Sequence, residues 1–261
     1  MRTIPKVVPP LPRPHSYKRN IPAFAAFSWI KAGWKDLLVR PLLSLFYGFG
    51  VFVVSAAVVT ALFVFDIDYI LFPALAGFMV IGPLLAVGLY EKSRRIAAGE
   101  PLSLFTILFV KPRSGGQVAF TGVLLCVLTL LWNRAAVLLY ALTFGLRPFP
   151  GLENIIPTLL HTTDGLILLG VGTAIGGLFA AFALAVSAFS IPMLLNEDTD
   201  ALTAMGTSVA LVWHNLPVML VWGAIVCFFF ALSVVTDFVA MIVIFPLLGH
   251  ATWHAYKAFR P

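Results

Sequence analysis

The sequence predicts an all-α protein, a polytopic transmembrane helical bundle of about six spans arranged as three hairpins. Two observations lead to this fold class. Of the 261 residues, 61% are hydrophobic and only 11% are charged, whereas a soluble domain carries about 25% charged residues. The mean hydropathy is +1.00, and several uncharged runs reach the roughly 20 apolar residues that cross a bilayer as a helix. We therefore expect a single membrane domain.

The N-terminal part predicts two different segments before the first span. Residues 1–22 contain six prolines among basic residues and are expected to form an extended cytoplasmic tail. The transmembrane domain is predicted to occupy residues 23–261. Within it, residues 24–39 place aromatic and aliphatic side chains at helical spacing and lysines on another side, which predicts an amphipathic helix in the membrane interface.

The remaining apolar runs pair into hairpins that are separated by shorter amphipathic segments. Two further interfacial segments are expected at residues 102–110 and 201–214. The runs end at acidic turns, at Pro- and Gly-rich loops or at basic clusters, none of which continues easily through hydrocarbon. The expected spans are residues 41–65, 69–90, 118–145, 166–195, 216–233 and 237–256.

The least certain joint of this topology is Thr236-Asp237, a polar point within the long apolar region 216–249. A tight turn there gives two short helices. The alternative is one long tilted or re-entrant segment, which gives five spans and an external C-terminus. The six-span topology places 15 of the 17 Lys and Arg residues on the side of the tail, as the positive-inside rule requires. We therefore predict a multi-pass protein of the bacterial inner membrane with both termini in the cytoplasm.

A weak internal repeat supports the three-hairpin plan. Pro83, Pro192 and Pro246 each lie near the cytoplasmic end of the second helix of a hairpin, and each is followed by two apolar residues. Because proline frees backbone carbonyls that neighbouring helices must satisfy, these positions predict three helix kinks. Gly172 and Gly176 form a GxxxG motif, which predicts close packing of the fourth span against another helix.

Arg134 is the only basic residue inside an expected span, and Asp237 is its obvious partner if the two lie at similar depth. One interpretation is a charge pair within or at the edge of the membrane. The other is that Arg134 extends to the outer interface while Asp237 caps a turn in water.

His250 and His254 stand four residues apart, hence on one helix face, a spacing that could bind a metal or a haem. The simpler interpretation is an interfacial belt with Trp253 and Tyr256. Nucleotide loops, serine-hydrolase elbows and zinc-type Cys/His spacings are missing from the sequence, so we expect no enzymatic activity and no cofactor. The basic charge, +6 in total, is distributed as in cytoplasmic loops that face anionic lipid, so nucleic acid is not an expected partner.

Four segments resemble one family over nearly the whole chain: RTIPKVVPPLPR, WIKAGWKDL, LYEKSRR and GHATWHAYK. This is a family of uncharacterised bacterial integral membrane proteins, some members of which have been described as putative cytochrome c oxidase components. The resemblance implies a connection to the respiratory chain, although the chain lacks the histidines on several spans that an oxidase core subunit needs to hold haem and copper.

These observations favour an accessory, assembly or regulatory subunit of a larger membrane complex, with a respiratory oxidase as the first complex to consider. Its expected partners are the lipid bilayer and other membrane protein subunits. A small-solute transporter or channel is the second hypothesis, motivated by the repeat and by Arg134 and Asp237. A haem or metal protein that uses His250 and His254 is the third.

Overall fold

The computed structural model describes residues 17–145, 147 and 149–260, apart from the side chain of Leu152. Most of the expected tail, 1–22, lies outside these residues. The described chain is helical, without strands. Its helices are α1 (Ala25–Leu38), α2 (Pro41–Val64), α3 (Leu71–Leu85), α4 (Val87–Ala98), α5 (Leu104–Leu108), α6 (Gly115–Phe144), α7 (Leu152–His161), α8 (Thr163–Ser187), α9 (Ser190–Asn196), α10 (Ala201–His214), α11 (Leu216–Val235) and α12 (Met241–Phe259).

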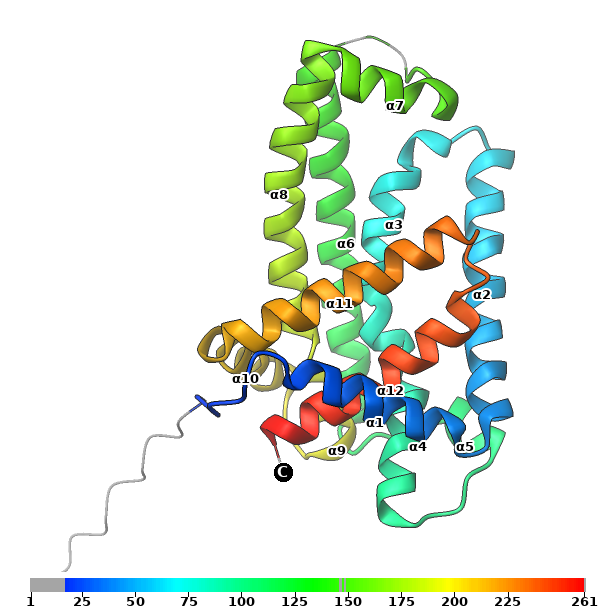
Figure 1. Ribbon diagram of the computed structural model, residues 1–261, viewed down its shortest axis with the longest axis vertical. Coiled ribbons are helices and arrows are strands. Elements are labelled where there is room, and N and C mark those ends of the chain that lie inside the picture. The colour runs from blue at the N-terminus through cyan, green and yellow to red at the C-terminus, as the bar shows by residue number, and fades with distance from the viewer. Residues whose placement is uncertain (1–16, 146, 148, 261) are drawn as a thin grey trace, which may run out of the picture.

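The long helices α2, α3, α6 and α8 run side by side along the length of the molecule (Figure 1). The two ends of the described chain meet at one end of this bundle, where the Arg19 Nε donates to the carbonyl of Phe259 at 2.9 Å. We call this the tail-side end. Helices α1, α4, α5 and α9 lie there, whereas α7 covers the opposite, far end (Figure 1).

In the described residues, five helical segments are long and apolar enough to cross a membrane. They are Pro41–Val64, Asp68–Ala98, Gly115–Phe144, Thr163–Asn196 and Leu216–Val235. The expected span 237–256 is not among them. The reason is local: the second half of α12 carries His250, His254 and Lys257, and packs into the protein instead of facing lipid.

The joint between α11 and α12 nevertheless lies where the sequence predicts it. A turn at Thr236–Ala240 separates two helices, and Asp237 and Phe238 adopt left-handed φ angles of 48° and 64° there. The two helices lie obliquely across the bundle (Figure 1). Their turn lies beside the middle of α2, because the Ser55 hydroxyl is 3.8 Å from the sulfur of Met241. The hairpin therefore starts from the tail-side end and returns to it.

The three short helices that precede the hairpins are α1, α5 and α10, as predicted. Each packs on the second helix of the preceding hairpin, in cyclic order: α1 on α12, α5 on α4, and α10 on α8 and α9. A Cβ added to Gly33 of α1 would lie 2.6 Å from the backbone nitrogen of Ala251. The repeat in the sequence thus corresponds to three units, which begin at α1, α5 and α10, and each unit packs against the other two.

The three prolines of the repeat are not equivalent in the structure. Pro83 precedes a break between α3 and α4 at Ala86, whereas Pro192 lies just after the break between α8 and α9. Pro246 lies inside the unbroken helix α12. Proline at 246 removes the amide that would bond the carbonyl of Ile242. That carbonyl faces Gly48 of α2, where a Cβ would collide with it.

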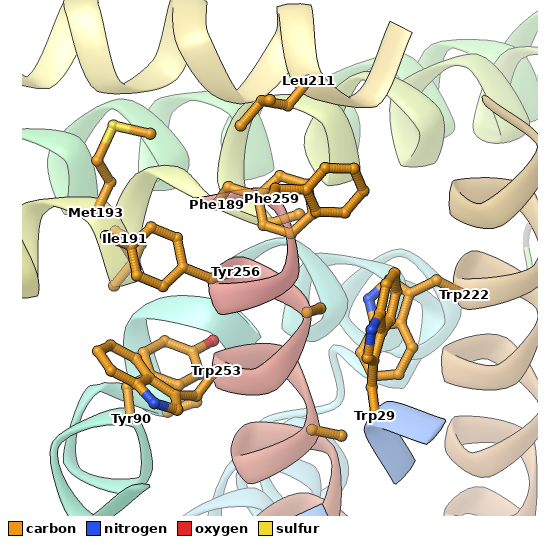
Figure 2. Packing of buried hydrophobic residues seen from close by; sticks show 14 of the residues in the cluster. Trp29, Tyr90, Phe189, Ile191, Met193, Leu211, Trp222, Trp253, Tyr256 and Phe259 are labelled. Atoms are coloured by element: carbon orange, nitrogen blue, oxygen red, sulfur yellow. The ribbon is translucent and has the colours of Figure 1, made fainter. Parts of the chain in front are cut away.

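The hydrophobic core lies at the tail-side end and not at the centre of the long bundle. Figure 2 shows its aromatic rings, with Trp29 of α1 against Trp222 of α11 at a centroid distance of 5.8 Å. Phe189 and Phe259 lie closer, at 4.8 Å. This core joins α1, α4, α9, α10, α11 and α12, and it holds the polar site described next in a fixed position.

Candidate functional site

A buried polar network surrounds His250, which is fully buried on α12. Its Nε2 lies 2.9 Å from the Ser44 Oγ of α2, and its Nδ1 lies 2.8 Å from the Ser93 Oγ of α4. Both ring nitrogens therefore have hydroxyl partners. Such partners fix the orientation of the imidazole ring.

Lys92 extends the network on the α2 side. Its side chain is fully buried, and its Nζ donates to the Ser44 Oγ at 2.6 Å and to the carbonyl of Leu37 at 3.5 Å. A buried ammonium is stable only when hydrogen bonds or an opposite charge compensate for lost hydration. Ser44 is consequently the shared partner of Lys92 and His250.

Asp36 of α1 lies at the opposite end of the network from Lys92. Its Oδ2 lies 2.8 Å from the Nε2 of His254, one helical turn beyond His250. Burial would raise the pKa of Asp36, but hydrogen bonds from His254 and Ser93 and the charge of His254 outweigh it and lower the pKa below its ordinary 3.8. Asp36 is therefore a carboxylate at neutral pH.

Together, these residues form one hydrogen-bonded chain from Lys92 to His254, which we call the His250 network. Its members are Asp36, Ser44, Lys92, Ser93, His250 and His254. They come from four helices, so the network joins α1, α2, α4 and α12. Because Ser44, Lys92 and His250 have no exposed surface, the hydroxyl is not accessible to a substrate. The arrangement can hold four helices in register.

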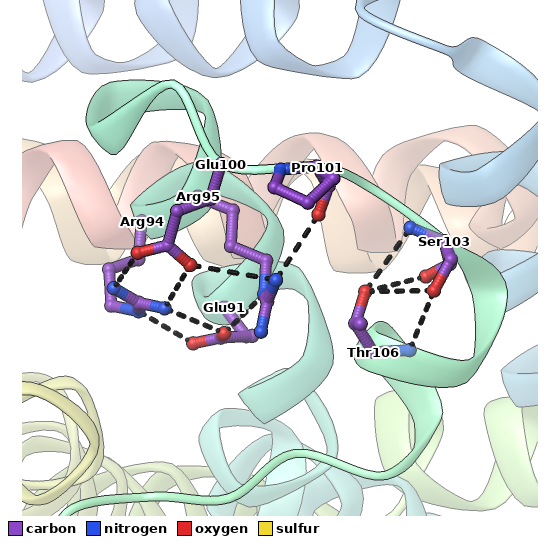
Figure 3. Close-up of polar contacts among 7 residues, drawn as sticks. All are labelled: Glu91, Arg94, Arg95, Glu100, Pro101, Ser103 and Thr106. Carbon is purple, nitrogen blue, oxygen red and sulfur yellow. Dashed lines mark hydrogen bonds and ion pairs between the residues drawn. The ribbon is translucent and has the colours of Figure 1, made fainter.

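A second group of charges lies on another side of α4 (Figure 3). Glu91 accepts two hydrogen bonds from Arg94, at 2.8 and 2.9 Å, and one from Arg95 at 2.6 Å. Glu100 accepts two more from Arg94, both at 3.0 Å. The Arg95 guanidinium also donates to the carbonyl of Pro101. Arg94 and Arg95 are thus neutralised by the two carboxylates next to them in the chain.

A third group of charged and polar side chains lies at the C-terminal end of α12. Glu197 forms an ion pair with Arg260 and accepts a hydrogen bond from the Tyr256 hydroxyl at 2.7 Å. Burial would raise the pKa of Glu197, but the hydrogen bonds from Arg260 and Tyr256 outweigh it and lower the pKa below its ordinary 4.5. This group ties the loop after α9 to the last turn of the chain.

The structure does not bring Arg134 and Asp237 together. Both side chains are exposed, on α6 and on the α11–α12 turn, and no ion pair joins these two described residues. Asp237 lies beside the middle of α2 because its hairpin is oblique, whereas Arg134 lies about 28 Å along α6 from its start. The predicted charge pair is therefore absent.

The two glycines of the GxxxG motif, Gly172 and Gly176, have different surroundings. A Cβ at Gly176 would lie 3.0 Å from Trp132 of α6, whereas a Cβ at Gly172 would meet only Leu168 of its own helix. Of the two glycines, only Gly176 thus lies against another helix, through the ring of Trp132. The two cysteines, Cys126 and Cys227, are free and exposed on the surfaces of α6 and α11.

His250 and His254 lie on one face of α12 as expected, yet they face hydroxyls and a carboxylate. Within the described residues, no group of three His, Cys, Asp or Glu side chains is placed to hold a metal. Sequence reasoning missed Asp36, Ser44, Lys92 and Ser93. The available signal was polar residues next to long apolar runs, but nothing in the linear order connects position 36 with position 254.

The long apolar helices define a polytopic helical integral membrane protein. Residues 71–196 match the model of a family described as predicted integral membrane protein (DUF2189). The match extends from α3 to α9, just under half of the chain, and includes Lys92 and Ser93 of the His250 network. No curated protein and no solved structure matches the chain significantly.

Proposed function

We propose that this protein is a non-enzymatic accessory or assembly subunit that binds another membrane protein through one face of α8. The supporting observation is a line of small, exposed residues along that helix. Nothing lies within 4 Å of a Cβ added at Gly170 or Gly177. Ala174 and Ala181 are exposed on the same face.

Small residues on an uncovered membrane helix favour a protein partner over lipid. Lipid tails are as apolar as leucine, so no hydrophobic effect drives helices together in a bilayer. Close backbone approach at small residues is what stabilises helix pairs there. Inside this protein the missing side chain of Gly176 makes room for the ring of Trp132, and Gly170 and Gly177 leave similar room for the side chains or backbone of a second helix.

The resemblance to proteins described as putative cytochrome c oxidase components makes a respiratory oxidase the first partner to test. The positive-inside rule supports a bacterial inner-membrane location with the tail-side end in the cytoplasm. Neither transport nor haem binding gains support from the geometry. Arg134 and Asp237 do not pair, and both ring nitrogens of His250 already have partners.

The test is co-purification of the tagged chain in mild detergent, with mass spectrometry of the proteins that migrate with it. We expect the same membrane partner with the wild type and with Gly206→Leu, a matched substitution at an exposed, open glycine of α10. Gly170→Leu and Gly177→Leu should lose it while keeping the thermal stability of the wild type. A partner that remains bound to both α8 variants, or a wild type that purifies alone, would contradict the proposal.

A further inference from the structure

An apolar groove of about 490 Å³ runs between α2 and α3. This volume is within the range of roughly 300–1,000 Å³ that holds small ligands. Its walls include Val51, Val54 and Val58 from α2 and Leu75 and Phe78 from α3. Phe238 contributes from the α11–α12 turn. The oblique hairpin thus helps to form a groove between two helices of another hairpin.

Both ends of the groove are defined by contacts. At the far end, α2 and α3 are joined by the short turn at residues 65–70. At the tail-side end, the Tyr47 hydroxyl donates to the carbonyl of Leu85 at 2.7 Å, and Leu108 of α5 adds to the wall. From Phe46 to Leu62 the groove follows α2 for about 24 Å. One leaflet of hydrocarbon is about 15 Å deep, so a whole acyl chain fits along it.

The walls face the hydrocarbon and are almost entirely apolar. Val54 is 63% exposed and Val58 is 51% exposed, so a lipid chain can enter sideways from the bilayer. The Ser55 hydroxyl is directed to the sulfur of Met241, and the Tyr47 hydroxyl to a backbone carbonyl. The groove therefore suits a hydrocarbon chain and offers little to a polar solute.

Two basic side chains lie next to segments that form the tail-side end of the groove. Arg40 precedes α2 and donates to the carbonyl of Leu102 at 2.6 Å, which holds its guanidinium beside the loop that leads to α5. Lys111 follows the groove-lining Leu108 by three residues. Neither of these exposed side chains forms an ion pair with a described carboxylate, whereas Glu91, Glu100 and Asp36 of the same end are paired.

We propose that the groove binds one acyl chain of an anionic phospholipid whose phosphate is bound by Arg40, with Lys111 close by. A guanidinium forms paired hydrogen bonds with phosphate oxygens. Basic residues at a membrane surface favour anionic over neutral lipid. The bound chain would fill the space between α2 and α3, which barely touch each other along most of their length.

Native mass spectrometry of the full chain in mild detergent tests this proposal, with phosphatidylglycerol, phosphatidylethanolamine and an isoprenoid quinone added separately. We expect phosphatidylglycerol to bind about five-fold more tightly than phosphatidylethanolamine, the effect of one basic residue near a membrane surface. Arg40→Gln should remove that preference. Arg40→Lys and Arg134→Gln, a change in an exposed arginine far along α6, should keep it.

Gly50→Phe fills the groove, since Gly50 lines it and a Cβ there meets nothing within 4 Å. This variant should lose binding of phosphatidylglycerol, whereas Gly116→Phe, at an equally open glycine of α6, should retain it. Tighter binding of the quinone or of phosphatidylethanolamine, or unchanged binding in Gly50→Phe, would overturn the proposal.

A measurement on the wild type makes the test independent of variant folding. Phosphatidylglycerol with a photoreactive group on its acyl chain is mixed with the full chain and irradiated, and the crosslinked peptides are identified. Crosslinks on α2 and α3 support the proposal. Crosslinks confined to other helices overturn it.

Discussion

The tail-side end of this protein packs like the interior of a soluble domain, whereas the long helices α2 and α6 bury few of their residues. In the most apolar stretch of α2 and of α6, only 11% of the residues are buried within the protein. At the tail-side end, Trp222, Tyr256 and Phe259 are at most 2% exposed. Exposed apolar helices suit a lipid environment, where no hydrophobic effect drives apolar side chains together, whereas the packing of the tail-side end resembles that of a water-surrounded core.

Buried polar groups at the tail-side end and in the apolar helices also differ in their hydrogen-bond partners. Asp36, Lys92 and His250 are buried at the tail-side end and take part in one network. The buried hydroxyl of Ser233, in the apolar helix α11, bonds only to a carbonyl of its own helix. The comparison teaches that tertiary specificity resides mainly at the tail-side end, and the spanning helices rely on local packing at residues such as Gly48 and Gly176.

The largest expected effect is that of Trp222→Ala. Removal of this buried ring from the contact with Trp29 should lower the free energy of unfolding by about 3–5 kcal/mol. The control is Leu220→Ala on the same helix, where the side chain is 69% exposed and the change should stay within about 0.5 kcal/mol. Reversible unfolding in detergent micelles measures both. Equal effects would remove the distinction between the two regions.

A smaller effect is expected from Ser44→Ala. The alanine leaves Lys92 and one nitrogen of His250 without their shared partner, which should cost about 1–3 kcal/mol. Ser233→Ala, at an equally buried serine, should change stability by no more than about 0.5 kcal/mol, since the Phe229 carbonyl keeps its helical donor. The same unfolding measurement applies. If the two serine variants behave alike, the His250 network does not stabilise the tail-side end.

The smallest effect concerns pH and the pairing of Glu197 with Arg260. The pKa of Glu197 in the folded protein is below its ordinary 4.5, so the pairing stabilises the fold above that pH. This contribution is lost as the pH falls through the folded pKa. The difference in Tm between the wild type and Glu197→Gln should therefore be constant above about pH 5.5 and shrink as the pH falls below 4.5. A difference that grows on acidification would contradict this assignment.

Much of the fold could be predicted because its signals are local. Apolar run length located the helices now seen as α2, α3, α6, α8 and α11, and helical spacing located α1 and α10. The polar pair Thr236-Asp237 located the turn between α11 and α12. The expected span 237–256 is not among the segments that are apolar enough to cross a membrane, because the residues after Gly249 include His250, His254 and Lys257. Those residues pack into the tail-side core, which the sequence does not show.

The candidate site was predictable only in part. His250 and His254 were recognised from their spacing on one helix face, yet their partners come from α1, α2 and α4. Asp36 and His254 are 218 positions apart in the chain but 2.8 Å apart in space. Arg134 and Asp237 were paired by similar reasoning about depth, and the oblique direction of α11 and α12 separates them.

By itself the sequence determined that this is a polytopic helical membrane protein, where its helices lie and which end carries the positive charge. These properties follow from hydropathy, helical period and charge distribution, each of which is a function of nearby residues. Only the tertiary structure decided where the core lies, which polar residues meet and that a lipid-sized groove separates α2 from α3. Those features depend on the angle and contact of helices far apart in the chain, and in a bilayer hydropathy does not select one helix neighbour over another.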